Sequence, residues 1–174
     1  MDEKSEMAGT ARANTIVAAL TIVMAALLVA AFFLPCASAA ADYRAALGEL
    51  SENPFGLANE ELADISLFEY VRIYLNAAPE SFAALYVPAT VAPAVLGVLT
   101  LLFSALRKPV PVIVFSVLAI AMSMLLTWNF EDRGVIPSSS YDWGEARWVY
   151  LVAGIAAIAF AAWAIALRRQ VRKA

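Results

Sequence analysis

The sequence predicts an all-α, polytopic membrane protein: a bundle of four transmembrane helices with short amphipathic helices in the first extracytoplasmic loop. Of its 174 residues, 63% are hydrophobic and 16% are charged. Soluble domains average about 45–50% apolar residues and about 25% charged residues. Four stretches are long and apolar enough to cross a hydrocarbon layer about 30 Å thick. None of these four stretches contains Asp, Glu, Lys or Arg.

The four predicted spans are residues 15–34, 82–106, 110–128 and 148–167. Inside lipid, every backbone N–H and C=O must be hydrogen-bonded within the protein, so we expect each span to be a helix. The short alternating segments of a membrane β-strand are absent from the sequence. The chain is therefore expected to be a single membrane domain, residues 1–174, with two longer loops on one side of the bilayer.

The distribution of Lys and Arg predicts the orientation of these spans. The N-terminal tail, the link between the second and third spans and the C-terminal segment carry eight of them, whereas the two longer loops carry four. Since basic loops stay in the cytoplasm, we expect both termini there, with the chain in the cell (cytoplasmic) membrane. The two outer loops hold 12 of the 15 acidic residues, which gives them a net charge of −8 against +5 inside.

The end of the first span has two interpretations. Ala37-Ser38-Ala39 has the small-x-small form of a signal-peptidase site, and cleavage there would leave three spans. The preceding tail has a net charge of −1, and the apolar run has the length of a full span, so we expect an uncleaved anchor. Cys36 has no second Cys for an internal disulfide, and we interpret it as a small apolar residue at the membrane edge.

The first outer loop, residues 35–81, is expected to form a helical cap. Residues 40–50 place apolar side chains on one side at helical spacing. Asn53 before Pro54 then indicates a break in the helix. Residues 59–63 begin with a suitable N-cap followed by acidic residues, which favours a second short helix.

The strongest local signal in this loop is the spacing of Ser66 and Glu69, which predicts a capping box ahead of an amphipathic helix. This helix leads into the second span, so we expect it to lie on the membrane or to cover the mouth of the bundle. It is either a lid that packs on the bundle or a docking surface for a partner or ligand. The candidate interaction surface, with two aromatic residues of the second loop, comprises Phe68, Val71, Tyr74, Leu75, Tyr141 and Trp143.

The second outer loop, residues 129–147, has the composition of a chain of turns. Tyr141 and Trp143 lie among four acidic residues, which is typical either of an interfacial anchor or of the rim of a site for a cationic group. Neither outer loop has its oxygen ligands in the order that a calcium loop requires.

Small residues recur at helical spacing in the last three spans, which predicts close contacts between helices. Pro88 and Pro93 within the second span predict a kink. The small faces are expected to meet in the interior of the bundle, while Leu, Ile and Phe face lipid. The candidate packing stripe comprises Ala89, Pro93, Gly97, Ser116, Ser123, Thr127, Ala153, Ala157 and Ala161.

Several functional classes lack the residues that they need. The chain has no His and one Cys, which excludes His-ligated haem, His-based metal sites and paired-cysteine thiol oxidoreductases. The spans hold no Asp, Glu, Lys, Arg or His for a proton relay. No phosphate-binding Gly loop or nucleophile elbow is present, and a net charge of −3 does not suit a nucleic-acid partner. We therefore name no catalytic, cofactor-binding or metal-ligating residue.

The predicted layout has both ends inside, a long first outer loop, the tight inner turn Arg107-Lys108-Pro109 and a shorter second outer loop. This layout is similar to that of claudins. The first outer loop of claudins carries a tryptophan-rich motif and a pair of cysteines, whereas this loop has no Trp and only Cys36. The resemblance extends to the topology alone and implies no function.

Three functional hypotheses follow from the sequence. The first is a non-catalytic integral membrane protein, a subunit, scaffold or interaction module whose acidic cap contacts a protein partner or another copy of the chain. The second is a small transporter or oligomeric channel for a neutral or cationic solute, lined by the hydroxyl groups of the third span. The third is an enzyme that acts on lipids with carboxylates of the outer helices.

Overall fold

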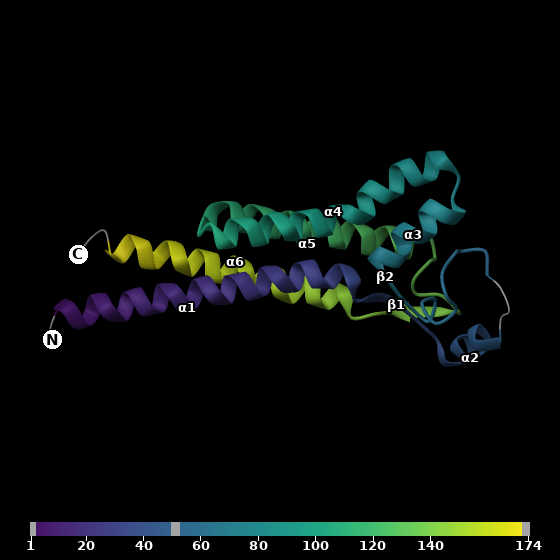
Figure 1. Ribbon diagram of the computed structural model, residues 1–174, viewed down its shortest axis with the longest axis horizontal. Helices are drawn as coiled ribbons and strands as arrows, with labels where there is room; N and C mark the ends of the chain where they lie inside the picture. Colours follow the sequence, from purple (N-terminus) through teal and green to yellow (C-terminus); the bar gives the residue numbers. More distant parts are fainter. Residues whose placement is uncertain (1–2, 50–52, 172–174) are drawn as a thin grey trace.

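The computed structural model describes residues 3–49 and 53–171, and Figure 1 shows a long helical bundle with a folded cap at one end. Four helices are long and apolar enough to cross a membrane, and each overlaps one predicted span. They are α1 (Glu3–Ala30), which a 3-10 turn η1 (Ala31–Phe33) continues, α4 (Glu80–Ala105), α5 (Pro109–Asp132) and α6 (Ala146–Val171).

The four long helices pack as a ring in the order α1, α4, α5, α6 and back to α1. Gly97 of α4 brings two backbones together, since a Cβ at this position would lie 3.2 Å from the carbonyl carbon of Leu28 in α1. In the predicted packing stripe, Pro93, Gly97, Ser116, Ala153, Ala157 and Ala161 are buried, whereas Ala89, Ser123 and Thr127 are half-buried.

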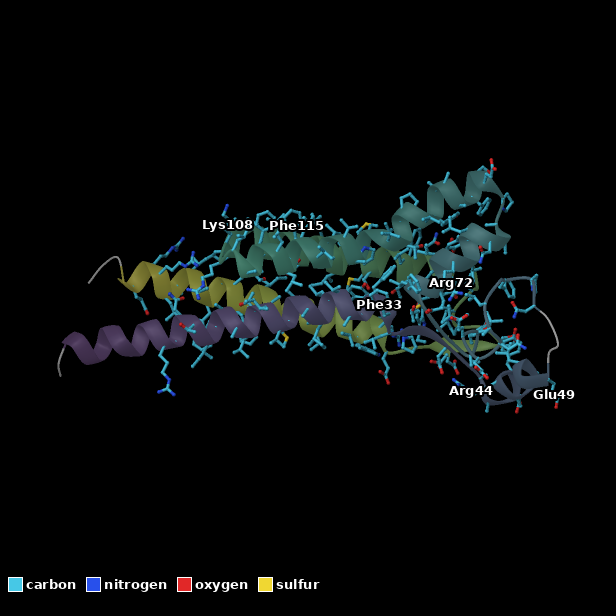
Figure 2. All side chains as sticks on the ribbon, viewed as in Figure 1. Phe33, Arg44, Glu49, Arg72, Lys108 and Phe115 are labelled. Atoms are coloured by element: carbon cyan, nitrogen blue, oxygen red, sulfur yellow. The ribbon has the colours of Figure 1, made fainter. Side chains whose placement is uncertain are left out.

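The buried row of α4 runs through Thr90, Pro93, Gly97, Thr100 and Ser104. The hydroxyls of its Thr and Ser residues donate to carbonyl oxygens one turn earlier in α4, at 2.7–2.8 Å. These groups are therefore satisfied within their own helix, as an apolar surrounding requires. Figure 2 shows mostly carbon along the middle of the bundle, with nitrogen and oxygen gathered toward its two ends.

The two prolines of the second span both lie inside α4. Figure 1 shows the part of α4 nearest the cap leaning away from the other three long helices. Proline removes one backbone hydrogen bond and its ring clashes with the preceding turn, which is the usual cause of such a bend. The amphipathic helix α3 (Leu67–Ala77) packs against α4.

A small antiparallel sheet, which the sequence analysis did not predict, joins the two loops into one cap (the described residues of 35–81 and 129–147). Its strands are β1 (Pro35–Ala39), β2 (Asp64–Ser66) and β3 (Tyr141–Trp143), in the order β2-β1-β3. Ala37 of β1 lies opposite both Ile65 and Trp143. The segment that resembles a signal-peptidase site is thus the central strand. A strand of small residues has no alternating pattern, so only its pairing with two distant segments reveals it.

The helices of the cap agree with the sequence in part. Besides α3, the cap contains α2 (Ala41–Glu49) within the predicted range 40–50. The capping box is confirmed: the Ser66 hydroxyl accepts from the N–H groups of Phe68 and Glu69, and the Glu69 carboxylate accepts from the N–H of Ser66 at 3.0 Å.

The short helix expected over residues 59–63 is wrong, because this segment forms hydrogen-bonded turns. The Glu61 carboxylate, expected in the first turn of that helix, instead accepts the N–H of Ala58 at 2.8 Å and the guanidinium of Arg72 at 2.7 Å. These contacts hold the segment against α3. The ion pair between Glu61 and Arg72, which are 11 residues apart in the chain, thus outweighs the local preference for a helix.

Candidate functional site

The predicted interaction surface on α3 is divided between two faces of the helix. Phe68 and Leu75 are exposed, at 40% and 63%, and Val71 is half-buried. Tyr74 is buried on the opposite face together with Leu67 and Tyr70. The outward face of α3 therefore presents Phe68, Val71 and Leu75, while Tyr74 belongs to the interior.

The inward face of α3 is held by stacked aromatic rings. Tyr74 stacks on Tyr86 of α4 with ring centroids 5.5 Å apart, and Tyr70 stacks on Phe130 of α5 at 4.9 Å. The guanidinium of Arg133 lies 4.8 Å from the centre of the Tyr86 ring. Burial raises the pKa of Tyr74 above its ordinary value, so this phenol stays neutral. Such contacts fix α3 to the ends of two long helices.

The start of α3 contacts the end of the first long helix. The exposed ring of Phe68 lies 5.5 Å from that of Phe33, which is 59% exposed, and 6.2 Å from that of Phe32. Large apolar side chains that remain exposed at the boundary between a bundle and its cap suit a lipid surface or another protein.

The two aromatic residues that were predicted for the rim of the second loop are half-buried in β3. The Tyr141 hydroxyl donates to the carbonyl oxygen of Leu62 at 2.8 Å, and its ring contacts that of Tyr43. Burial raises the pKa of Tyr141 to about 12. Trp143 lies against the guanidinium of Arg147, 5.0 Å from the ring centre. Both side chains therefore help to hold the cap together.

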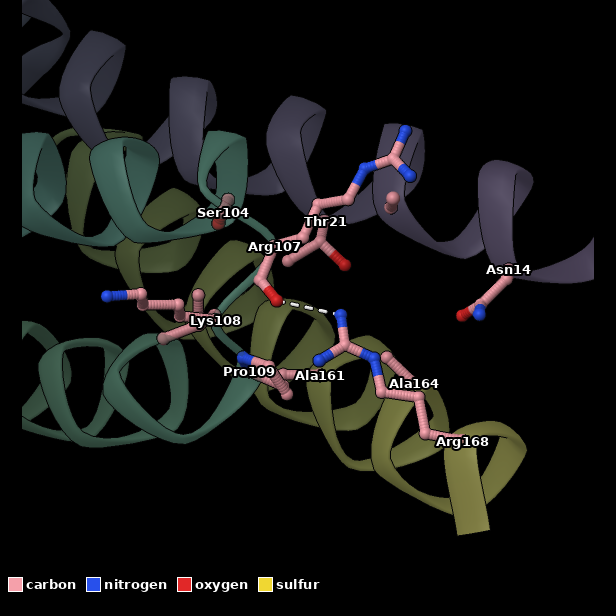
Figure 3. Close-up of a pocket in the computed structure, with 11 residues that line it drawn as sticks. Asn14, Thr21, Ser104, Arg107, Lys108, Pro109, Ala161, Ala164 and Arg168 are labelled. Carbon is pink, nitrogen blue, oxygen red and sulfur yellow. Dashed lines mark hydrogen bonds between the residues drawn. The ribbon is translucent and has the colours of Figure 1, made fainter. Parts of the chain in front are cut away.

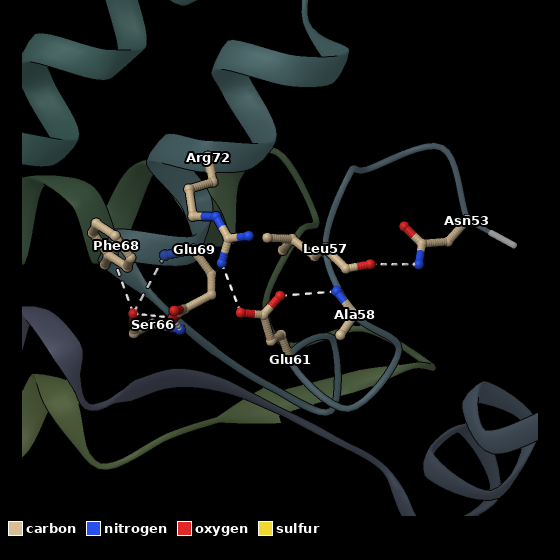
Figure 4. Close-up of polar contacts among 8 residues, drawn as sticks. All are labelled: Asn53, Leu57, Ala58, Glu61, Ser66, Phe68, Glu69 and Arg72. Atoms are coloured by element: carbon tan, nitrogen blue, oxygen red, sulfur yellow. Dashed lines mark hydrogen bonds and ion pairs between the residues drawn. The ribbon is translucent and has the colours of Figure 1, made fainter.

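Two ion pairs hold the first loop. Arg44 pairs with Asp64 at 2.8 Å and Arg72 pairs with Glu61 at 2.7 Å. Figure 4 shows Glu61 between Arg72 and the backbone of Ala58. The Arg44 guanidinium lowers the pKa of Asp64. The hydrogen bond from the N–H of Ala58 is the largest cause that lowers the pKa of Glu61, and the hydrogen bond from Arg72 lowers it further.

The cations of the cap are thus turned toward its own groups, whereas most of its carboxylates face outward. Arg44 and Arg72 are paired with acids, and Arg133 and Arg147 lie against aromatic rings. Within residues 3–49 and 53–171, eight exposed carboxylates of this end form no ion pair. They are Asp42, Glu49, Glu60, Glu80, Glu131, Asp132, Asp142 and Glu145.

Cys36 is buried in β1, where its thiol donates to the carbonyl oxygen of Ile65 at 3.2 Å. Burial raises the pKa of this thiol to about 12. Because the thiolate is the reactive form, burial and a raised pKa both disfavour reaction of Cys36 at neutral pH. It is a structural residue of the cap.

A cavity of about 220 Å³ lies between the ends of α5 and α6 nearest the cap. Ser123, Thr127 and Glu131 of α5 line it together with Arg147 and Tyr150 of α6. The sequence analysis placed Ser123 and Thr127 in a packing stripe and did not single out Arg147 or Tyr150. Both had a signal, since Arg147 is a cation next to the start of a span and Tyr150 is one of the aromatic residues near the outer ends of the spans.

A smaller cavity of about 60 Å³ lies at the opposite, basic end of the bundle (Figure 3). Arg107, Lys108 and Arg168 line it, and Arg168 donates to the carbonyl oxygen of Arg107 at 2.7 Å. Arg107 has a φ of 54°, the left-handed conformation that allows the tight turn between α4 and α5. The hydroxyl of Thr21, also in its lining, donates to the carbonyl oxygen of Val17 at 2.7 Å.

No protein-family model matches the chain, and comparison with curated proteins and with solved structures found no significant similarity. Among the described residues, no three His, Cys, Asp or Glu side chains form a group that could hold a metal ion.

Proposed function

We propose that the chain is a non-catalytic integral membrane protein, a subunit, scaffold or interaction module that binds a basic protein partner through its acidic cap. The observation that carries this proposal is the arrangement of charge at the cap. Its four arginines are engaged by carboxylates or aromatic rings of the chain itself, and eight carboxylates remain exposed. A surface of one sign attracts and orients a partner of the opposite sign.

The partner test is a pull-down of the tagged full-length chain from native membranes in mild detergent. We expect a retained partner that dissociates when the salt concentration rises from about 0.1 M to about 0.5 M, because salt screens exposed charges. The triple variant Asp132→Asn, Asp142→Asn, Glu145→Gln is expected to retain several-fold less partner. Its matched control neutralises three acids of the N-terminal tail, Asp2→Asn, Glu3→Gln and Glu6→Gln, and is expected to retain as much partner as the wild type.

Two results would contradict the proposal. One is recovery of the wild-type chain alone and monomeric from native membranes. The other is equal retention of the partner by the wild type and by the variant with the three cap acids neutralised. A partner that both triple variants lose equally would reflect overall charge and not the cap, and would count against the proposal too.

We further propose that both termini lie in the cytoplasm and that the cap lies outside, in the cell membrane. The basic residues Arg107, Lys108 and Arg168 at the end opposite the cap support this orientation. Cys36 is expected to be unreactive in the folded chain at about pH 8, because its thiol is buried and protonated. New cysteines at exposed positions can therefore be followed one at a time.

With a membrane-impermeant maleimide on intact cells, Ser139→Cys of the cap is expected to be labelled and Gln170→Cys of α6 to be labelled only after the membrane is opened. The wild type, whose single thiol is Cys36, serves as the control and gains label only in denaturant. The reverse pattern of labelling would place the cap in the cytoplasm.

The alternative function, a small transporter or channel for a neutral or cationic solute, has one observation in its favour. Ser123 and Thr127 of the hydroxyl stripe line the cavity between α5 and α6. Two observations count against it. Ser116 of the same stripe is fully buried and does not line the cavity, and Arg147 adds a positive charge to the lining. Solute flux into proteoliposomes of the purified chain would favour this alternative.

A further inference from the structure

The cavity between α5 and α6 has an apolar rim. Met124, Trp128 and Trp148 line it, and their side chains are 55–60% exposed. These residues belong to α5 and α6, two of the four helices that are long and apolar enough to cross a membrane, so this rim meets lipid when the chain lies in a bilayer. A ligand that reaches the cavity across the rim must therefore be an amphiphile of the bilayer.

Two polar groups of the cavity lining lack hydrogen-bond partners within the described chain. Tyr150 is 1% exposed, yet its hydroxyl has no hydrogen-bond partner among the residues described. The Nε of Arg147 is likewise buried without an acceptor there. The burial of an unpaired hydroxyl or guanidinium N–H is unfavourable, so both groups favour a ligand that brings acceptor oxygens.

The two charged groups of the cavity are also not paired with each other. The guanidinium of Arg147 lies between the rings of Trp143 and Trp148, 5.0 and 5.1 Å from their centres. Glu131 lines the same cavity from α5, and within residues 3–49 and 53–171 neither group takes part in an ion pair. A guanidinium outside any ion pair and a carboxylate outside any ion pair, both in the lining of one cavity, complement a ligand that carries both charges.

From these contacts we propose that the cavity binds the headgroup of a zwitterionic phospholipid. The phosphate oxygens accept hydrogen bonds from the guanidinium of Arg147 and the hydroxyl of Tyr150, as phosphate does at planar arginine groups. The ammonium group of the headgroup lies at the carboxylate of Glu131. The acyl chains leave across Met124, Trp128 and Trp148 into the bilayer. This site shares Glu131 and Arg147 with the acidic end of the molecule proposed above to bind a partner, but the partner test substitutes neither of them, so the two tests can fail separately.

The test is native mass spectrometry of the full-length chain in mild detergent, titrated with phosphatidylethanolamine or with phosphatidylglycerol. We expect the wild type to bind phosphatidylethanolamine more tightly. Arg147→Gln is expected to weaken this binding about tenfold or more, because a hydrogen bond to a charged group is lost. Tyr150→Phe removes only the hydroxyl and is expected to weaken it several-fold. The matched control Arg133→Gln changes an arginine outside the cavity lining and is expected to bind as the wild type does.

A third variant tests the recognition of the ammonium group. Glu131→Gln is expected to abolish the preference for phosphatidylethanolamine over phosphatidylglycerol. Soluble phosphoethanolamine, which lacks acyl chains, is expected not to displace the lipid, and complete displacement would mean that a free headgroup is the ligand. Equal affinity of the wild type for both lipids, or unchanged binding by both Arg147→Gln and Tyr150→Phe, would overturn the proposal. Tyr150→Phe keeps the test valid if Arg147→Gln fails to fold.

Discussion

Gly144→Ala is expected to lower the free energy of unfolding by about 3 kcal/mol or more, a large share of the roughly 5–15 kcal/mol typical of folded domains. A Cβ at this position would overlap the carbonyl oxygen of Pro35 and lie 2.5 Å from its carbonyl carbon. The N–H of Gly144 also donates to the carbonyl oxygen of Cys36 at 2.9 Å. Both neighbours are backbone atoms of β1, so relief of the overlap requires the sheet to separate. Unfolding in denaturant, followed by the exposure of Cys36 to maleimide, measures the effect.

Two other glycines serve as controls for this substitution. A Cβ at Gly48 in α2 meets no atom within 4 Å, so Gly48→Ala is expected to stabilise the helix by about 0.5–1 kcal/mol. Gly134 has open space around it but a φ of +63°, so Gly134→Ala is expected to cost only about 1–2 kcal/mol. Unfolding of Gly144→Ala at the same denaturant concentration as the wild type would contradict the close approach of β1.

Gly97→Leu is expected to separate α1 from α4 and to cost about 2–3 kcal/mol. The position of a Cβ at Gly97 is 3.2 Å from the carbonyl carbon of Leu28 and from the backbone nitrogen of Val29. A single methyl group needs only a small shift there, whereas an isobutyl group cannot fit between two helix backbones. Helices in lipid associate largely through such close packing, so exposure to water cannot compensate for the lost packing contacts between α1 and α4. Thermal unfolding in detergent, with Gly97→Ala as an intermediate step, measures the series.

Gly154 of α6 provides the matched comparison. A Cβ at this position would lie 2.6 Å from a side-chain carbon of Ile120, and this side chain can change its rotamer. Gly154→Ala is therefore expected to cost less than about 1.5 kcal/mol. If Gly97→Leu and Gly154→Ala lower the melting temperature equally, contact between the α1 and α4 backbones is not what Gly97 provides.

The cap and the cavity are joined through the first turns of α6. Gly144 follows β3 and contacts β1. Arg147 lies against Trp143 of β3. Arg147 and Tyr150 then reach the cavity from the same helix end. Damage to the sheet at Gly144 is therefore expected to disturb the cavity as well, whereas separation of α1 and α4 at Gly97 acts on the other side of the ring.

The sequence by itself determined the four long apolar helices, the capping box at Ser66 and Glu69 and the separation of charge between the ends. Each of these is a local property. In lipid, a charge-free run of about 20 residues forms a helix, because its backbone groups must be hydrogen-bonded within the protein. A capping box needs only four neighbouring residues. The inward direction of Tyr74 could be predicted from helical spacing, because Tyr74 shares a face with the buried Leu67. The exposed position of Phe68, in contrast, depends on where α4 and α5 lie.

Only the tertiary structure decided the sheet, the turns at residues 59–63 and the cavity between α5 and α6. Strand β1 pairs with residues that lie about 30 and 100 positions further along the chain, and its own small side chains carry no pattern. The unpartnered hydroxyl of Tyr150 is a property of its surroundings and not of its own segment. Such features depend on which distant groups come together, and this follows from the packing of the whole ring of helices.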